Sequence, residues 1–419
     1  MSKVIVVGGG ASGMMSAIAA ADAGNEVILL ESNEKLGKKI YITGKGRCNF
    51  TNASDIEDVF EAVVSNKKFM YSAFYTFTNS DVLDFFEKAG MPYKIERGNR
   101  AFPVSDHSSD VIKTLEKSMK SKGVKVFLHT FVSEILTEDY FENEKSKYIR
   151  KIIGVRLKNG DVLNCDNVIL ANGGNSYQTT GSDGNGYKLA KKLGLKVTDI
   201  RPALVPLVTK EGYIPFLQGL SLKNVSISIF NGNKKLYEDF GEMLFTHFGI
   251  SGPIVLSASS YISKYLPGEL KAYIDLKPAL SAEQLDKRLL REFDENQNKQ
   301  IKSIIPHILP NKMSSVFLDL AGIDENTVIN SITRQQRENM VNVMKHFPMT
   351  IIDTRGFKEA IVTQGGVGIK EINPSTMETK KVKGLYVVGE LLDLDALTGG
   401  FNLQIAWSTG YLAGSSIID

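Results

Sequence analysis

Cysteine and histidine are scarce in this chain. Two cysteines, Cys48 and Cys165, and five histidines occur among 419 residues. Two cysteines cannot form a disulfide framework or a cysteine-based metal cluster, and the histidines lack the short spacings of metal ligands. We therefore expect no metal site, and the composition is typical of a protein of the reducing cytoplasm.

The chain also lacks long apolar segments and a strong charge of one sign. No stretch provides the ~20 uninterrupted apolar residues that a membrane-spanning helix needs. Charge is nearly balanced, with 50 basic against 47 acidic residues, so electrostatics gives no reason to expect nucleic acid as a partner. We therefore expect neither a membrane nor a nucleic-acid partner. Nothing in the sequence indicates an oligomeric state.

Glycine, by contrast, is concentrated near the N-terminus. Residues 4–13 read VIVVGGGASG, with Gly8, Gly10 and Gly13 in GxGxxG spacing after a β-branched run. A helical stretch and a second apolar run ending at Glu31 follow, which completes the order strand, turn, helix, strand. The three glycines allow a tight turn, close approach of a pyrophosphate and close helix–strand packing. The free N–H groups of the helix start suit phosphates, and Glu31 suits ribose hydroxyls, so a dinucleotide site is predicted.

The same segment has some features of a secretory signal. Lys3 precedes an apolar stretch, and three alanines stand at 19–21. Three consecutive glycines interrupt that stretch, however, and it runs directly into Glu31, which favours the dinucleotide site.

Patterns along the chain predict a discontinuous α/β domain with two insertions, as expected for a length that exceeds one core. Alternating helix and strand patterns cover 1–195; they include a strand over 125–132 and a hairpin turn at Asn159-Gly160. Strands return in 348–419, which ends in a helix. Short apolar stretches between turn residues predict a β-rich domain over 196–278, and capped helical patterns predict a helical domain over 279–347.

The last strand and helix have the form seen in two-domain flavoproteins. An apolar strand over 385–388 is followed by Gly389 and Glu390, and Gly399-Gly400 begins the helix. Free amides at this helix start would face the N1–C2=O edge of a flavin, where negative charge collects on reduction. An ordinary buried C-terminal helix is the alternative, but it leaves the Gly-Gly start unexplained. The predicted nucleotide is therefore FAD.

Four segments together resemble one bacterial flavoprotein family. They are the GGGASG start, GKGRCNFTN (44–52), LFTHFGISGP (244–253) and the segment 376–407, in the family's order over nearly the whole chain. The family is the YhiN-like and BaiN-like group of NAD(P)/FAD-dependent oxidoreductases, also called aminoacetone oxidase family FAD-binding enzymes. The resemblance implies a FAD-binding, glutathione-reductase-type Rossmann-like domain with inserted β-barrel-like and helical domains. Lys45 and Asn172 depart from the family pattern, but neither removes a glycine that the backbone needs.

The resemblance also implies which residues hold FAD. Glu31 would bind the adenosine ribose, the backbone of Val132 would contact adenine, and the 44–49 loop would wrap the ribityl chain and the flavin. The implied residues are Gly8, Gly10, Ala11, Ser12, Gly13, Glu31, Lys39, Gly44, Gly46, Arg47, Cys48, Asn49, Val132, Asn172, Gly173, Gly389, Glu390, Gly400, Asn402 and Leu403.

Four residues are candidates for catalysis, most of them with a structural alternative. Arg47 would favour reduced flavin or orient an anionic substrate, or else hold its loop through backbone carbonyls. Cys48 is either a flavin-side thiol or a compact apolar residue. His247 would exchange protons near the flavin or brace the turn at 249–253. Arg100 is expected to face the active site.

These features predict a FAD-dependent oxidoreductase that transfers hydride or electrons between flavin and a small organic substrate. No second GxGxxG occurs in a strand–helix–strand setting, so NAD(P)H is expected at most as a transient reductant. Two alternatives stay open: a flavoprotein that acts on a macromolecule, as tRNA-modifying flavoproteins do, and an NAD(P)H-dependent reductase of an unsaturated steroid-type acid. A non-enzymatic FAD-binding regulator also stays open. The fold does not choose a substrate.

Overall fold

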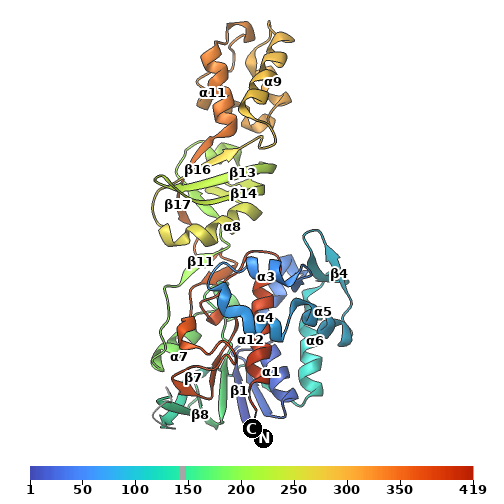
Figure 1. The fold of residues 1–419 in the computed structure, drawn as a ribbon, viewed down its shortest axis with the longest axis vertical. Helices are drawn as coiled ribbons and strands as arrows, with labels where there is room; N and C mark the ends of the chain where they lie inside the picture. Colours follow the sequence, from blue (N-terminus) through green and yellow to red (C-terminus); the bar gives the residue numbers. More distant parts are fainter. Residues whose placement is uncertain (142–147, 419) are drawn as a thin grey trace. The chain divides into compact units, whose positions relative to one another are not determined.

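The computed structural model describes residues 1–141 and 148–418 and divides into two compact units (Figure 1). The first unit consists of Met1–Pro202 and Phe357–Asp419, and the second of Ala203–Gly356. Both ends of the chain therefore belong to the first unit. Among the helices in these described ranges, none is long and apolar enough to cross a membrane.

A five-stranded parallel sheet forms the centre of the first unit, in the order β20-β10-β1-β2-β6. Its strands are β1 (Lys3–Val7), β2 (Glu26–Leu30), β6 (Lys125–Phe127), β10 (Asn167–Leu170) and β20 (Leu385–Val387). Most of its strands are continuous apolar runs with buried side chains, because helices and loops cover both faces of a parallel sheet. The expected Rossmann-type sheet is confirmed, and its last strand comes from the C-terminal part of the chain.

Two helices from opposite ends of the chain, α1 (Ala11–Asp22) and α12 (Phe401–Ser415), pack side by side (Figure 1). A Cβ at Gly410 would lie 2.5 Å from the Ser12 carbonyl oxygen, and one at Gly414 would lie 2.4 Å from that of Ser16. Glycine at both positions therefore allows the two backbones to approach closely. This packing fixes the N-terminal glycine motif against the C-terminal helix.

The remaining elements of the first unit surround this core. The helices are α2 (Lys38–Ile42), α3 (Ile56–Glu61), α4 (Tyr71–Thr76), α5 (Asn79–Lys88), α6 (Ser108–Ser121) and α7 (Asn185–Lys192). A three-stranded sheet contains β3 (Thr51–Asn52), β4 (Tyr93–Glu96) and β5 (Arg100–Pro103). A second small sheet contains β7 (Val132–Asp139), β8 (Arg150–Leu157), β9 (Val162–Asn164) and β19 (Val382–Lys383). A short two-stranded sheet pairs β11 (Arg201–Ala203) with β18 (Val362–Gln364).

Two local expectations in this unit have different outcomes. The hairpin turn at Asn159-Gly160 is confirmed, since β8 and β9 pair antiparallel around it. The single strand expected over 125–132 is wrong. Here β6 ends at Phe127 in the parallel sheet and β7 begins at Val132 in another sheet, with His129 at a positive φ of 52° between them.

The second unit is a closed barrel with helices packed on it. The barrel strands, in order around it, are β12 (Leu207–Thr209), β15 (Gly249–Ser251), β14 (Lys234–Phe245), β13 (Ser221–Asn231), β16 (Leu270–Asp275) and β17 (Phe347–Thr354). In β13, Val225, Ile227 and Ile229 are buried and alternate with more exposed residues, as barrel strands require. The helices are α8 (Pro253–Ile262), α9 (Ala282–Asp294), α10 (Ser314–Ala321) and α11 (Arg334–Lys345).

The barrel and the helical segment share one hydrophobic core, to which Ile274, Phe293 and Phe317 all belong. The two segments therefore form one compact unit, whereas the sequence pattern predicts two inserted domains over 196–278 and 279–347. Strand β17 pairs with both β12 and β16 and closes the barrel. For this reason the second unit extends to Gly356, beyond the expected boundary at 347. Its first residue is Ala203, whereas the sequence pattern predicts that the insertion begins at 196.

Candidate functional site

The glycines of the GxGxxG motif have separate roles in the first unit. Gly8 has a positive φ of 108°, and a Cβ there would lie 2.5 Å from the Ala171 carbonyl oxygen. A Cβ at Gly13 would lie 1.9 Å from the Gly8 carbonyl oxygen. A Cβ at Gly10 would meet no atom within 4 Å. Packing thus requires the first and third glycines, whereas the space beside the second is open.

Helix α1 begins at this open space without a capping side chain. The Met14 amide donates to the Gly10 carbonyl, but the amides of Ala11, Ser12 and Gly13 have no partner among the described residues. Such amides, together with the positive end of the helix dipole, form a binding site for an anion.

Glu31 stands at the end of β2, next to this motif. Its carboxylate is buried and accepts hydrogen bonds from the Gly9 amide at 2.7 Å and from the Asn33 amide and side chain at 2.8 and 2.7 Å. The Ser32 hydroxyl also donates to Oε1 at 3.2 Å, whereas Oε2 accepts only from Gly9 among the described residues. Each carboxylate oxygen offers about two acceptor positions, so Oε2 leaves room for a hydroxyl. The arrangement fits the predicted role of Glu31 at a ribose.

The C-terminal segment meets the motif directly. A Cβ at Gly389 would lie 2.5 Å from the Ser12 hydroxyl oxygen. Close contacts also link Gly174 with Glu390, since a Cβ at that glycine would lie 3.0 Å from the Glu390 carboxyl carbon. The segments that follow β1, β10 and β20 therefore converge at the carboxyl edge of the sheet, where ligands bind in open α/β sheets.

Glu390 lies within a network of polar groups. Its carboxylate accepts hydrogen bonds from the Lys39 ammonium at 2.6 Å, the Ser176 hydroxyl at 3.0 Å and the Thr363 amide at 2.8 Å. Burial alone would raise the pKa of Glu390, but the adjacent Lys39 charge and these hydrogen bonds outweigh it and hold the pKa below its usual value. Lys39 and Glu390 were predicted, whereas Ser176 and Thr363 carry no sequence signal.

Helix α12 has the same kind of start as α1. Gly400 precedes it at a positive φ of 96°, and a Cβ there would lie 2.5 Å from the Thr51 carbonyl oxygen. No side chain caps the helix, and the amides of Phe401, Asn402 and Leu403 have no partner within the described ranges. The Asn402 side chain is itself structural, because it bonds to both the amide and the carbonyl of Ala396 at 3.0 and 2.7 Å.

Two predicted cofactor residues carry buried oxygens without hydrogen-bond partners. They are the side-chain carbonyls of Asn49 and Asn172. Buried polar atoms are nearly always paired, so an unpaired one calls for an explanation such as a missing ligand. Together with the two uncapped helix starts and the open space at Gly10, these atoms show that the residues present fit a dinucleotide.

The loop that contains Asn49 has an unusual backbone. Gly44, Lys45, Gly46 and Cys48 all have positive φ. The Arg47 guanidinium bonds to Glu96 at 2.5 Å and to Asp106 at 2.6 Å. These hydrogen bonds raise the pKa of Arg47. Arg47 therefore holds the loop through the carboxylates of Glu96, on β4, and Asp106, whereas the structural alternative predicts bonds to backbone carbonyls. A role for Arg47 at the flavin stays a prediction.

Cys48 is fully buried, and burial raises the pKa of its thiol to about 12, against the opposing effect of a hydrogen bond with Thr43. Cys165 is also buried, and burial together with Asp166 raises its pKa to about 12. The thiolate is the reactive form of cysteine. The environment of Cys48 therefore favours the interpretation as a compact apolar residue.

We expect both thiols to resist modification in the native protein. A rise in pKa from 9.0 to about 12 lowers the thiolate fraction at neutral pH about a thousandfold. A thiol-reactive chromophore should therefore detect almost no cysteine before denaturation and two per chain afterwards. Fast labelling of one thiol in the folded protein would contradict the buried position of that cysteine.

The other candidates lie outside this constellation. Arg100 is exposed on β5 and donates to the Arg97 carbonyl at 2.9 Å. His247 is exposed in the second unit, at the turn between β14 and β15, with its ring edge against Phe248. Val132 begins β7, and its carbonyl accepts a hydrogen bond from Asn185. In the part of the chain that the structure describes, no group of three His, Cys, Asp or Glu residues could hold a metal ion.

Comparison with known proteins identifies the family of the chain. The model of the family described as "HI0933-like protein Rossmann domain" matches residues 2–416. The chain belongs to this family. The HI0933-like family is one of FAD-binding oxidoreductases, so the resemblance to YhiN-like and BaiN-like flavoproteins is confirmed.

Two relatives with assigned names cover nearly all of this HI0933-like chain. A "3-dehydro-bile acid delta(4,6)-reductase" of Clostridium scindens is 35% identical over 99% of this chain and 98% of its own. A "Ribosomal RNA dihydrouridine synthase" of Haemophilus influenzae is 32% identical over 99% of this chain and 98% of its own.

A solved structure supports the fold. The 3-ketosteroid delta1-dehydrogenase of Sterolibacterium denitrificans has a TM-score of 0.51 with this chain and 13% identity, over 99% of both chains. At this identity the likeness concerns the fold alone. The Rossmann-type fold expected from the sequence is confirmed.

Proposed function

We propose that this chain binds FAD in its first unit and reduces a carbon–carbon double bond conjugated with a carbonyl group in a small organic molecule. The observation that carries the FAD assignment is the pair of uncapped helix starts, on α1 and α12, in one packed unit. One helix start suits the pyrophosphate of a nucleotide, and the other suits an electron-rich ring at the far end of the same molecule, as in FAD.

Residues on both sides of the sheet edge would hold the cofactor. The amides at the start of α1 and the open space at Gly10 suit the pyrophosphate, and Glu31 suits the adenosine ribose. The amides at the start of α12 suit the electron-rich edge of the ring system. Asn49 and Asn172 present the unpaired oxygens for the remaining polar groups.

Bound FAD would supply the two-electron chemistry, and the protein would supply position and electrostatics. The Lys39–Glu390 pair keeps the carboxylate charged beside the site, so that it accepts hydrogen bonds and does not donate a proton there. The positive end of α12 stabilises negative charge that develops next to its first turn. Cys48 and Phe50 are fully buried beside the loop.

The reaction class is supported by the names of the relatives. A 3-dehydro bile acid with double bonds at positions 4 and 6 is a conjugated ketone. Dihydrouridine is uridine whose ring double bond, conjugated with a carbonyl, has been reduced. The two named activities, held by relatives of 35% and 32% identity, thus share one kind of bond. We extend this shared chemistry to the present chain.

A second candidate substrate is uridine in RNA. Two relatives carry the name ribosomal RNA dihydrouridine synthase, the second being the Escherichia coli protein at 30% identity. The nearly balanced charge of the chain, with 50 basic against 47 acidic residues, favours the small molecule, because RNA binding draws most of its affinity from phosphate contacts.

The two candidates separate in one anaerobic experiment. The flavin of the purified protein is reduced with dithionite, excess reductant is removed, and a 3-oxo-4-ene steroid acid, its saturated analogue or a uridine-rich RNA is added. We expect flavin absorbance to return only with the unsaturated acid, and its product to gain two hydrogens by mass spectrometry. If flavin absorbance returns with RNA alone, the substrate is the second candidate, uridine in RNA. No return with either would contradict the reaction class. Reduction by NADH or NADPH in place of dithionite identifies the donor.

The place of α12 at the flavin leads to a redox prediction. Leu403→Glu introduces a carboxylate into the first turn, and Leu403→Gln is its uncharged control of equal size. We expect the glutamate variant to have the lower midpoint potential, by about 10–40 mV, because an interaction at the helix end amounts to about 0.3–2 kcal/mol. Redox titration against a reference dye measures it. Equal potentials in the two variants would place the flavin elsewhere.

A further inference from the structure

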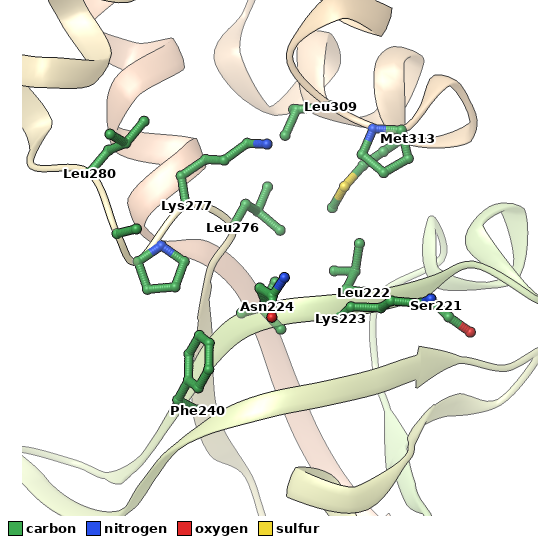
Figure 2. A pocket seen from close by; sticks show the side chains of 14 residues that line it. Ser221, Leu222, Lys223, Asn224, Phe240, Leu276, Lys277, Leu280, Leu309 and Met313 are labelled. Carbon is green, nitrogen blue, oxygen red and sulfur yellow. The ribbon is translucent and has the colours of Figure 1, made fainter.

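The second unit contains a cavity of about 540 Å³, beside the start of β13 (Figure 2). The cavity lies between that strand, residues 276–280 after β16, and residues 309–313 before α10. Its volume falls within the range of about 300–1,000 Å³ that is usual for small-molecule sites. Every residue that lines it belongs to the second unit.

The walls of this cavity are largely apolar. Leu222, Leu276, Leu309 and Met313 are buried side chains that face it, and Phe240, which is 57% exposed, stands at its rim. An apolar surface of this kind suits a hydrocarbon or ring body, since removing such a body from water is favourable.

Lys277 gives the cavity its charge. Its side chain extends toward Leu309 in Figure 2, and its ammonium has no ion pair or hydrogen bond with the residues that the structure describes. Neighbouring Lys345, in contrast, pairs with Asp275 at 2.5 Å and bonds to the Leu280 carbonyl at 2.8 Å. Burial, together with the nearby Arg288 charge, lowers the pKa of Lys277.

Among the residues that the structure describes, neither of the two lysines that line the cavity has an ion-pair partner. Lys223 also lines it, and none of the described lining residues is an aspartate or a glutamate. Arg288 lies in the adjoining hollow, which shares Leu280 with the cavity. The positive charge of Arg288 acts on Lys277, and an anion bound at the cavity would relieve this like-charge repulsion.

We propose that this cavity binds a small organic acid with an apolar body, whose carboxylate pairs with Lys277 and whose body lies on Leu276, Leu309 and Met313. The site belongs wholly to the second unit and needs none of the residues assigned to FAD. It is therefore independent of the proposed function.

Calorimetric titration of the full, flavin-containing protein with dodecanoate tests this proposal. We expect binding at one site per chain. Lys277→Gln should weaken it about tenfold, the effect of losing one charge-assisted hydrogen bond, and Lys277→Arg should retain most of it. Lys299→Gln, at an exposed lysine outside the cavity, is the matched control and should leave the affinity unchanged. Dodecyltrimethylammonium, with the same chain and the opposite charge, should bind at least about tenfold more weakly than dodecanoate.

Other outcomes would overturn the proposal. Absence of dodecanoate binding, or equal affinity in the natural protein and Lys277→Gln, would show that the cavity is not a site for organic acids. A single-stranded oligoribonucleotide is titrated in parallel. If it binds in a manner that depends on Lys277 while dodecanoate does not, the cations form a nucleic-acid surface instead. Flavin absorbance of the same samples reports separately on the first unit.

Discussion

A Gly10→Val protein is expected to fold and to be purified without flavin. The valine side chain would enter space in which no protein atom lies within 4 Å of the new Cβ, so packing of the apoprotein should not suffer. Loss of glycine at the helix N-cap costs at most about 1 kcal/mol. The same side chain would occupy the space proposed for the pyrophosphate. Overpacking of 1–3 kcal/mol or more then weakens FAD binding by about fivefold to over a hundredfold.

Two further glycine variants make this result specific. Gly13→Val should unfold or strongly destabilise the first unit, because its Cβ would lie 1.9 Å from a backbone oxygen. Gly212→Val, in the second unit, also meets no atom within 4 Å and should retain full flavin. Flavin content is measured from absorbance per chain, and apoprotein stability from thermal unfolding. A stable Gly10→Val protein with full flavin affinity would show that the pyrophosphate does not lie beside Gly10.

Asp395→Asn is expected to stabilise the first unit at neutral and alkaline pH. The Asp395 side chain is fully buried, and burial raises its pKa from 3.8 to about 6, against hydrogen bonds with Ser65 and Gln364. A carboxyl group whose pKa is raised by folding stabilises the protein below about pH 4, and this contribution is lost as the pH rises through 6. A shift of about two pH units corresponds to about 3 kcal/mol.

The direction in which the stabilisation by Asp395→Asn changes with pH tests the raised pKa. The stability gained by Asp395→Asn should be smaller at pH 5 and should increase toward pH 8, where it approaches about 3 kcal/mol. Denaturant unfolding of the apoprotein, followed by fluorescence of the single tryptophan, measures it, since Trp407 is buried in the first unit. Asp58→Asn, at an exposed aspartate of the same unit, is the control. A stability difference that does not change between pH 5 and pH 8 would contradict the raised pKa.

The features that the sequence predicts correctly are local. The GxGxxG turn, the Asn159-Gly160 hairpin and the C-terminal helix depend on residues within a few positions of one another. Gly13 is needed because of a contact with Gly8 inside a single strand–turn–helix unit, and the motif encodes that contact, whereas the close neighbour of Gly8 itself is the distant Ala171. The fold of the nucleotide domain could therefore be predicted from short patterns.

The features that the sequence misses depend on distant partners. Strand β17 has the apolar pattern of any strand, and only its pairing with β12 and β16 assigns it to the barrel. The segment 125–132 changes sheets at His129, which alternation of apolar residues does not reveal. Thr363 and Ser176 reach Glu390 across 27 and 214 positions of the chain. Arg47 likewise meets its carboxylate partners 49 and 59 positions away.

Identification of the released cofactor tests the central claim most directly. The protein is purified, denatured and filtered, and the small molecule in the filtrate is identified by chromatography and mass spectrometry. The two uncapped helix starts, Glu31 at the ribose position and the unpaired oxygens of Asn49 and Asn172 predict one FAD per chain. Release of FMN, or a protein that stays colourless after reconstitution with FAD, would contradict the account.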